Sequence, residues 1–148
     1  MSESILTNRN GVLIYQETWT PTIEKSDDSK TLPTYETMQV NGLYSRIGRI
    51  CYVSCWFYIK VTAAGTSDIC IGSLPYISKN DSSDKYQVLS TGSLDATVHT
   101  RYGSALLFDN TNKVIIYKHN RNQPQTYTTN SETEISFSGC YLINSSYS

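Results

Sequence analysis

The segment Arg49–Thr62 constrains the fold more than any other part of the chain. Its residues alternate with period two, which is the pattern of a β-strand. One face of the predicted strand is entirely apolar and consists of Cys51, Val53, Cys55, Phe57, Ile59 and Val61. The other face also carries large apolar groups among its members, which are Ile50, Tyr52, Ser54, Trp56, Tyr58 and Lys60. The segment therefore predicts a long strand whose two faces both favour burial.

The rest of the chain repeats the period-two pattern, with Gly, Asn, Asp and Pro between the segments. Asn41-Gly42 and Asp109–Asn112 are typical turn sequences. Short strands at a spacing of roughly 8–12 residues, with no helical period between them, favour an antiparallel sandwich or barrel over a parallel sheet. We therefore predict an all-β fold, with further strands over 11–20, 34–40, 67–74, 86–90, 95–100, 104–109, 113–119 and 132–143.

The length and charge of the chain limit what it is and what it binds. Its 148 residues fit one domain spanning 1–148, in which residues 1–10 are expected to be flexible. The formal net charge is −1 and the lysines and arginines form no basic run, so no strong field attracts nucleic acid.

No stretch approaches the roughly 20 apolar residues that span a bilayer, and residues 1–10 lack the basic and apolar regions of a signal peptide. We predict neither nucleic-acid binding nor membrane insertion.

The cysteines are predicted to be reduced and buried. Cys51 and Cys55 lie on the same side of an apolar strand, where cysteine acts as a small hydrophobic residue. A disulfide is the alternative for the full set, which is Cys51, Cys55, Cys70 and Cys140. The spacing of Cys51 and Cys55 is not one that zinc sites use, and His99 and His119 stand in separate segments. We predict no metal and no other cofactor.

The second face of the strand Arg49–Thr62 predicts an oligomer. In a lone antiparallel sandwich, one face meets the core and the other meets water. A large aromatic ring buries about 150–250 Å², so several rings left in water would make a patch that monomers rarely carry. The alternative is that a loop, or the strand Gly11–Thr20, covers this face within the same chain. We predict a contact between subunits that is formed by Ile50, Tyr52, Trp56 and Tyr58.

Catalytic chemistry is not indicated by the residues. Nucleophilic catalysis needs a nucleophile, a base and an orienting group, and the chain contains no G-x-S-x-G sequence. His99 and His119 fit surface or strand-end positions. A glycosidase needs two facing carboxylates, but nearly all the candidates stand at turns or strand ends, where solvation explains them; they are Asp68, Asp81, Asp84, Asp95, Asp109, Glu132 and Glu134. We predict that the protein is not an enzyme.

Four motifs follow one another in a characteristic order along most of the chain. They are Trp19-Thr20-Pro21-Thr22, then QVNGLYSRIGR over 39–49, IGSLPY over 71–76 and ISFSGCYL over 135–142. This order resembles the C-terminal domains of bacteriophage tail-fibre, head-fibre and receptor-binding proteins. The chain departs from that pattern at one place. The pattern has a single residue between the glutamine and the glycine, whereas here Asn41 is an extra residue between Gln39 and Gly42. We predict a bulge or a loop shift at this point.

The resemblance implies a jelly-roll-like antiparallel β-sandwich that forms a homotrimer on a virion, in a tail or head fibre. Residues 1–10 would then be flexible or would form the end of a preceding fibre segment. The implied partners are other fibre or tail proteins and a receptor on the host cell, and no enzymatic activity is implied. Two alternatives stay open, namely a structural fibre cap or trimerisation domain that binds no receptor, and a polysaccharide-degrading enzyme.

Two long polar loops are the candidate receptor-binding surfaces. Proteins recognise sugars with aromatic faces and with amide or carboxylate groups, and loops on a rigid β scaffold commonly carry binding. The first loop spans Tyr76–Tyr86 and the second spans His119–Tyr127. We predict that both loops gather at one end of the fold and contact a host-surface glycan, with ordinary solvated loops as the alternative. The candidate residues are Tyr76, Asn80, Asp81, Tyr86, His119, Arg121, Asn122 and Tyr127.

Overall fold

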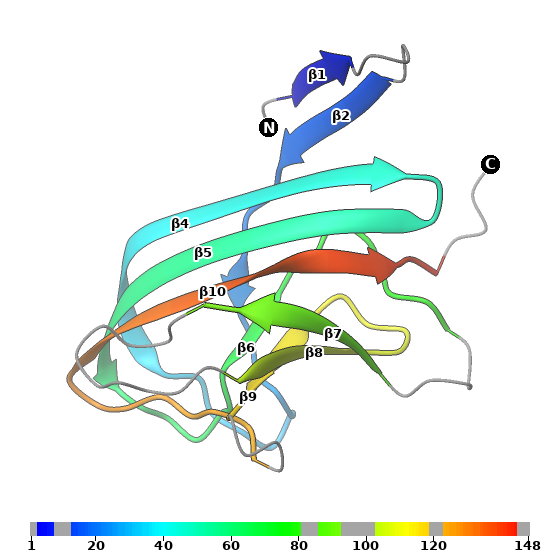
Figure 1. Ribbon diagram of the computed structural model, residues 1–148. Helices are drawn as coiled ribbons and strands as arrows, with labels where there is room; N and C mark the ends of the chain where they lie inside the picture. The colour runs from blue at the N-terminus through cyan, green and yellow to red at the C-terminus, as the bar shows by residue number, and fades with distance from the viewer. Residues whose placement is uncertain (1–2, 8–12, 81–85, 93–102, 119–122, 145–148) are drawn as a thin grey trace.

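The computed structural model describes residues 3–7, 13–80, 86–92, 103–118 and 123–144, which contain ten strands and no helix (Figure 1). None of these residues therefore forms a helix long and apolar enough to cross a membrane. Every pairing is antiparallel, and the strands join into one sheet in the order β1-β2-β4-β5-β10-β7-β8-β9-β6-β3. The predicted all-β antiparallel class is confirmed. The bounds are β1 Glu3–Thr7, β2 Leu13–Thr18, β3 Thr22–Ile23, β4 Thr34–Ile47, β5 Ile50–Ala63, β6 Cys70–Gly72, β7 Tyr86–Thr91, β8 Ser104–Phe108, β9 Val114–Tyr117 and β10 Ser131–Leu142.

The centre of the sheet is the hairpin of β4 and β5, and β10 lies along the other edge of β5. The two hairpin strands have 14 residues each and pair along almost their whole length. The turn between them is Gly48-Arg49, and Gly48 has a φ of 58°, which favours glycine. All twelve residues of β10 pair with β5. The predicted long strand is therefore confirmed within one residue at each end, and it has a neighbour on both sides.

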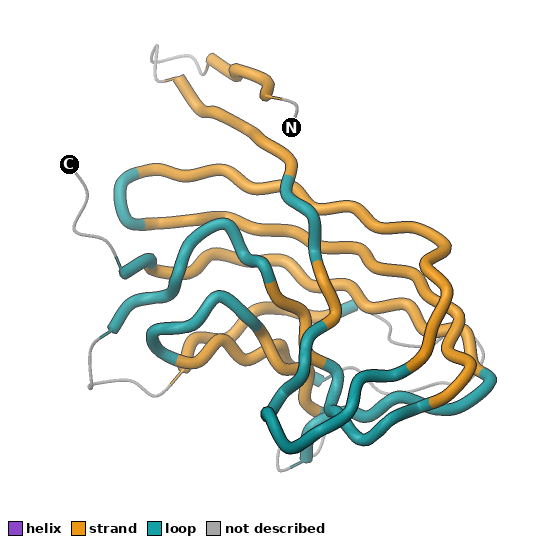
Figure 2. The backbone as a smooth tube through the Cα atoms, turned by 180° about the vertical axis from the view of Figure 1, so that it is seen from behind, coloured by secondary structure: helices purple, strands orange, loops and turns teal. Residues whose placement is uncertain are grey.

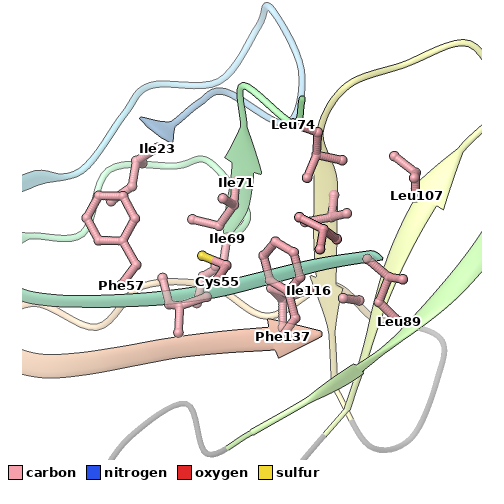
Figure 3. Close-up of a cluster of buried hydrophobic side chains, with 14 of the residues drawn as sticks. Ile23, Cys55, Phe57, Ile69, Ile71, Leu74, Leu89, Leu107, Ile116 and Phe137 are labelled. Carbon is pink, nitrogen blue, oxygen red and sulfur yellow. The ribbon is translucent and has the colours of Figure 1, made fainter. Parts of the chain in front are cut away.

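The sheet curls over on itself, and a short segment near the N-terminus crosses between its two halves. Strand β2 pairs with β4, whereas β3 pairs with β6, so residues 18–23 cross from one half of the sheet to the other (Figure 2). The inner face of β5 consists of the six residues predicted to be buried, and each of them is at most 5% exposed. Figure 3 shows Cys55 and Phe137 from β5 and β10 in one cluster with Ile71 and Ile116 from β6 and β9. The core therefore lies between the two halves of a single curled sheet.

Trp19 fixes the crossing segment to the β4–β5 hairpin. Its indole N–H donates to the carbonyl oxygens of Leu43 and Ser54, each at 3.1 Å, and its backbone N–H donates to the carbonyl of Gly42 at 3.0 Å. A Cβ on Gly42 would lie 2.5 Å from the Trp19 carbonyl oxygen, so glycine is required for this approach. The turn predicted at Asn41-Gly42 was wrong, because Gly42 lies inside β4 and makes room for Trp19.

Other boundaries differ from the predictions where the strands bend or cross. Strand β4 continues seven residues beyond Val40, and its unpaired extra residue is Met38 rather than Asn41. The strand predicted over 11–20 is shorter and β3 follows it, because the chain crosses between the two halves of the sheet there. The segment β1, for which no strand was predicted, pairs with β2. The strand predicted over 95–100 lies outside the described residues.

The substitution Gly48→Ala is expected to lower the free energy of unfolding by about 1 kcal/mol, because a left-handed backbone strains an L-residue. A Cβ at Gly48 would meet no atom within 4 Å, so no steric clash adds to that strain. Urea unfolding followed by circular dichroism measures the change. Unaltered stability would contradict the geometry of this turn.

All four cysteines are free thiols in the structure. Burial raises the pKa of Cys51 to about 11 and the pKa values of Cys55 and Cys70 to about 12. These three thiols are buried as predicted. Cys140 is exposed, because the alternation of β10 places it on the outer face of the sheet opposite Tyr52.

Iodoacetamide at about pH 8 is expected to alkylate Cys140 alone in the folded protein, because the thiolate is the reactive form and the three buried thiols ionise only at higher pH. Mass spectrometry of the labelled protein counts the adducts. The same reaction in denaturant provides the control and should modify all four thiols. Labelling of Cys55 as fast as that of Cys140 would contradict the packing of the core.

Candidate functional site

The structure describes four of the eight residues predicted for receptor binding. Tyr76 is half-buried, with the Arg46 guanidinium 4.7 Å from its ring centre. Asn80 and Tyr86 are exposed. Tyr127 is 5% exposed and belongs to the core, so it does not present a binding surface. The other four, Asp81, His119, Arg121 and Asn122, lie outside the described residues.

The described parts of the two predicted binding loops lie at opposite ends of β10, and not together as predicted. The backbone N–H of Lys79 donates to the carbonyl of Leu142 at the C-terminal end of β10. The second loop ends at Tyr127, and the residue after it, Thr128, accepts a hydrogen bond from the Ser131 hydroxyl at the N-terminal end of β10. A strand of twelve residues spans roughly 35–40 Å. A single sugar ring therefore cannot contact both segments.

A different site lies on the outer face of the sheet, where β4, β5, β10 and β7 are neighbours (Figure 1). A groove of about 480 Å³ crosses these strands. The register places Ser54 of β5, Ser138 of β10 and Ser90 of β7 in one row on its floor. We call this groove, with its floor of three serines and the side chains of Tyr52 and Trp56 on either side, the serine trough.

Tyr52 and Trp56 form the two walls of the serine trough. Each stands two residues from Ser54 along β5, so all three side chains share one face of the sheet. The rings are 45% and 38% exposed, respectively. Leu43 of β4 pairs with Ser54 and closes one end of the floor. The site therefore combines two accessible aromatic side chains with a polar floor between them.

Carboxylates on β10 hold the polar atoms of two aromatic side chains on β5. The Trp56 indole N–H donates to Glu134 Oε1 at 2.8 Å, and the Tyr58 hydroxyl donates to Glu132. The second hydrogen bond raises the pKa of Tyr58, because it is lost when the phenol ionises. The two acidic residues thus have partners in the sheet, and the indole of Trp56 is held in a fixed orientation.

Gly92, directly after β7, shapes the far side of the serine trough. Its backbone N–H donates to the carbonyl of Ser136 at 3.0 Å. A Cβ at this position would collide with the hydroxyl oxygen of Ser136. The end of β7 therefore lies close against β10, and a larger residue at position 92 would displace the Ser136 hydroxyl that lines the trough.

The outer face becomes aliphatic beyond Tyr52, towards the β4–β5 turn. Ile50 of β5 pairs with Ile47 of β4 and with Leu142 of β10, and the three side chains are 41–58% exposed. We call these three residues the aliphatic patch. The described part of segment 11–20 pairs with the edge of β4 and sends Trp19 into the core. It therefore does not cover this face, so the described structure does not support the strand 11–20 as the alternative to a subunit contact.

The chemistry of the serine trough is that of hydroxyl groups, aromatic rings and the Asn41 side-chain amide, which also lines it. Proteins use these groups to bind sugars and other polar ring compounds. Within the described segments, no three His, Cys, Asp or Glu side chains gather as metal ligands would. The fold and the site together define an all-β antiparallel domain with an open aromatic and hydroxyl groove on the outer face of its sheet.

Comparisons with known proteins add no relative to this description: the chain matches no protein family, no curated protein and no solved structure.

The alternation in the strand Arg49–Thr62 indicates the two walls of the serine trough but not its floor. Tyr52 and Trp56 were predicted to form a subunit contact, and no role was predicted for Ser54. A usable signal was present, since Ser136 and Ser138 alternate with buried residues on β10 as Ser54 does on β5. Only the register between the strands shows that Ser54, Ser138 and Ser90 form a row.

Proposed function

We propose that the protein is the receptor-binding domain of a bacteriophage fibre, and that it attaches the virion to a glycan on the host-cell surface without cleaving it. The serine trough is the observation that carries this proposal. Sugars bind proteins by placing their C–H faces on aromatic rings and by hydrogen bonding to fixed polar groups. The trough supplies both at one accessible place. The motif order from Trp19 to Leu142 supports the fibre assignment.

The composition of the trough supports binding rather than cleavage. Glycoside hydrolysis uses two carboxyl groups that flank the scissile bond. None of the described residues that line the trough is acidic, and none is a histidine. Glu134 lies at the edge of Trp56, where it accepts the indole hydrogen bond. The polysaccharide-degrading alternative therefore has less support than binding alone.

Binding to bacterial cells tests the proposal. The isolated protein, labelled with a fluorophore, is expected to bind some strains in a panel that differs in surface polysaccharide. Mild periodate oxidation of those cells should abolish the binding, and protease treatment should not. Release of reducing sugar from the polysaccharide would favour the enzyme. Binding to no strain would contradict the proposal and favour a structural fibre cap.

We further propose that the curled sheet is a jelly-roll-like sandwich and that three copies of it meet through the aliphatic patch. Ile50 belongs to the subunit contact that the sequence predicts. We place Tyr52 and Trp56 in the serine trough instead, because their side chains flank a polar floor. Tyr58 lies beside the trough, where its hydroxyl donates to Glu132. The patch has only aliphatic side chains, and the burial of such apolar surface against another subunit is favourable in free energy.

Substitution of Ile50 by glutamate is expected to convert the trimer to monomers, because it places a charge in a contact that excludes water. Light scattering after size-exclusion chromatography should give three times the chain mass of 16.7 kDa for the unaltered protein and one chain mass for the variant. Leu32→Glu is the matched control, since Leu32 is also exposed but lies outside the patch. A monomeric unaltered protein would contradict the trimer.

A further inference from the structure

The serine trough has a direction, which follows from the register of the sheet. Ser54 pairs with Ser138, Ser138 pairs with Ser90, and Ser90 pairs with Ser104. Four serines therefore stand in one row across β5, β10, β7 and β8, at a spacing of about 4.8 Å from strand to strand. The first three line the groove itself. The trough thus runs across the strands rather than along them.

The repeat of this row matches a chain of sugar rings. A pyranose ring is about as long as the distance between neighbouring strands, and every ring of an oligosaccharide carries hydroxyl groups. A serine hydroxyl both donates and accepts hydrogen bonds. Successive rings laid across the sheet would therefore each meet one serine. The aromatic walls stand on β5 alone, so one ring is held between Tyr52 and Trp56 while the next rings are held by hydrogen bonds.

The charges around the trough select against an acidic ligand. The described residues that line it include no lysine and no arginine. The Glu134 carboxylate is 2.8 Å from the indole nitrogen of Trp56, so a negative charge lies beside one wall. An anionic ring placed between the walls would be repelled by that carboxylate, with no described cation in the lining to offset the repulsion. An uncharged ring would not be repelled.

We infer that the serine trough binds a linear, uncharged oligosaccharide that lies across β5, β10 and β7. Its anchoring ring sits between Tyr52 and Trp56, and its following rings lie over Ser138 and Ser90. This inference rests on the proposed function, because it takes the trough as the receptor site and specifies the chemistry of the receptor. Glu134 acts as the residue that sets the preference for an uncharged chain.

Isothermal titration calorimetry with defined oligosaccharides tests the inference. The probes are uncharged α- and β-linked hexose oligomers of one to four rings, together with matching oligomers of hexuronic acid. For the linkage that binds, the affinity is expected to rise about fivefold or more with each ring up to the third and then to level off. The matching uronic acid oligomer is expected to bind at least about tenfold more weakly.

Two variants and one control separate the parts of the inference. Ser138→Ala should remove most of the gain from the second ring, whereas Ser45→Ala, on the same face of β4 but outside the trough, should leave the affinity unchanged. Glu134→Gln should narrow the difference between uncharged and acidic oligomers while the uncharged oligomer still binds.

The possible failures point to different conclusions. Equal affinity for one ring and three rings, or a preference for the acidic oligomers, would overturn the inference. Periodate-sensitive binding to cells without binding to any uncharged oligomer would overturn the inference alone and leave the proposed function standing. Absence of binding to every strain and every oligomer would overturn both.

Discussion

Replacing Trp56 by alanine is expected to weaken binding of the protein to glycan-bearing cells about 10- to 100-fold. The substitution removes one wall of the serine trough and leaves the Glu134 carboxylate without its indole donor. Truncation of a central aromatic residue in a binding site commonly costs 2 kcal/mol or more, and about 1.4 kcal/mol corresponds to a factor of ten in affinity. Titration of cells with the labelled protein measures the dissociation constant.

Two further variants make this result specific. Trp56→Phe keeps an aromatic face without the indole N–H and should retain part of the affinity. Tyr86→Ala removes a ring that is 47% exposed on β7 but does not line the trough, so it should bind as the unaltered protein does. Equal losses in Tyr86→Ala and Trp56→Ala, or no loss in Trp56→Ala, would contradict the placement of the site.

The other tryptophan is expected to control stability instead. Trp19→Ala should lower the free energy of unfolding by about 3–5 kcal/mol, which is the range for truncating a large buried aromatic side chain. The loss includes the buried ring and the hydrogen bonds from its N–H to the carbonyls of Leu43 and Ser54. The free energy of unfolding of a domain of this size is about 5–15 kcal/mol, so the variant should lose a large share of its stability.

Urea unfolding of matched variants tests this role of Trp19. Trp19→Phe should fall between the unaltered protein and Trp19→Ala, because it keeps most of the apolar contact but loses the two indole hydrogen bonds. Trp56→Ala is the control, since Trp56 is 38% exposed and its loss leaves no cavity in the core. If Trp19→Ala and Trp56→Ala destabilise the protein equally, Trp19 does not hold the crossing segment.

The central strand was predictable because its pattern is a local property of the sequence. The alternation of Cys51, Val53 and Cys55 with polar or aromatic residues fixes both the strand type and the face that enters the core. The position of Gly42 was not predictable in this way, because an Asn-Gly pair is a common turn signal. Its actual role depends on Trp19, which lies more than twenty residues earlier and approaches the backbone of β4.

Long-range pairing also decides where the candidate site lies. Tyr127 stands in a polar stretch of the sequence, but its side chain is buried. The reason is that Gln125, two residues earlier, accepts a backbone hydrogen bond from Ile69 and donates one to Ile116, which fixes the segment against the sheet. The row of Ser54, Ser138 and Ser90 exists only once three strands are in register. Exposed aromatic residues on β5 could be recognised from the sequence, but the polar floor between them could not.

Amide chemical-shift mapping by NMR locates the ligand on the folded protein without any substitution. Addition of the surface polysaccharide from a strain that the protein binds should shift the amide signals of Tyr52, Ser54, Ser90 and Ser138. The signals of Asn80 and Gln123, in the two polar loops, should stay in place. Shifts confined to those loops, with the trough unaffected, would contradict the proposal that the outer face of the sheet holds the glycan.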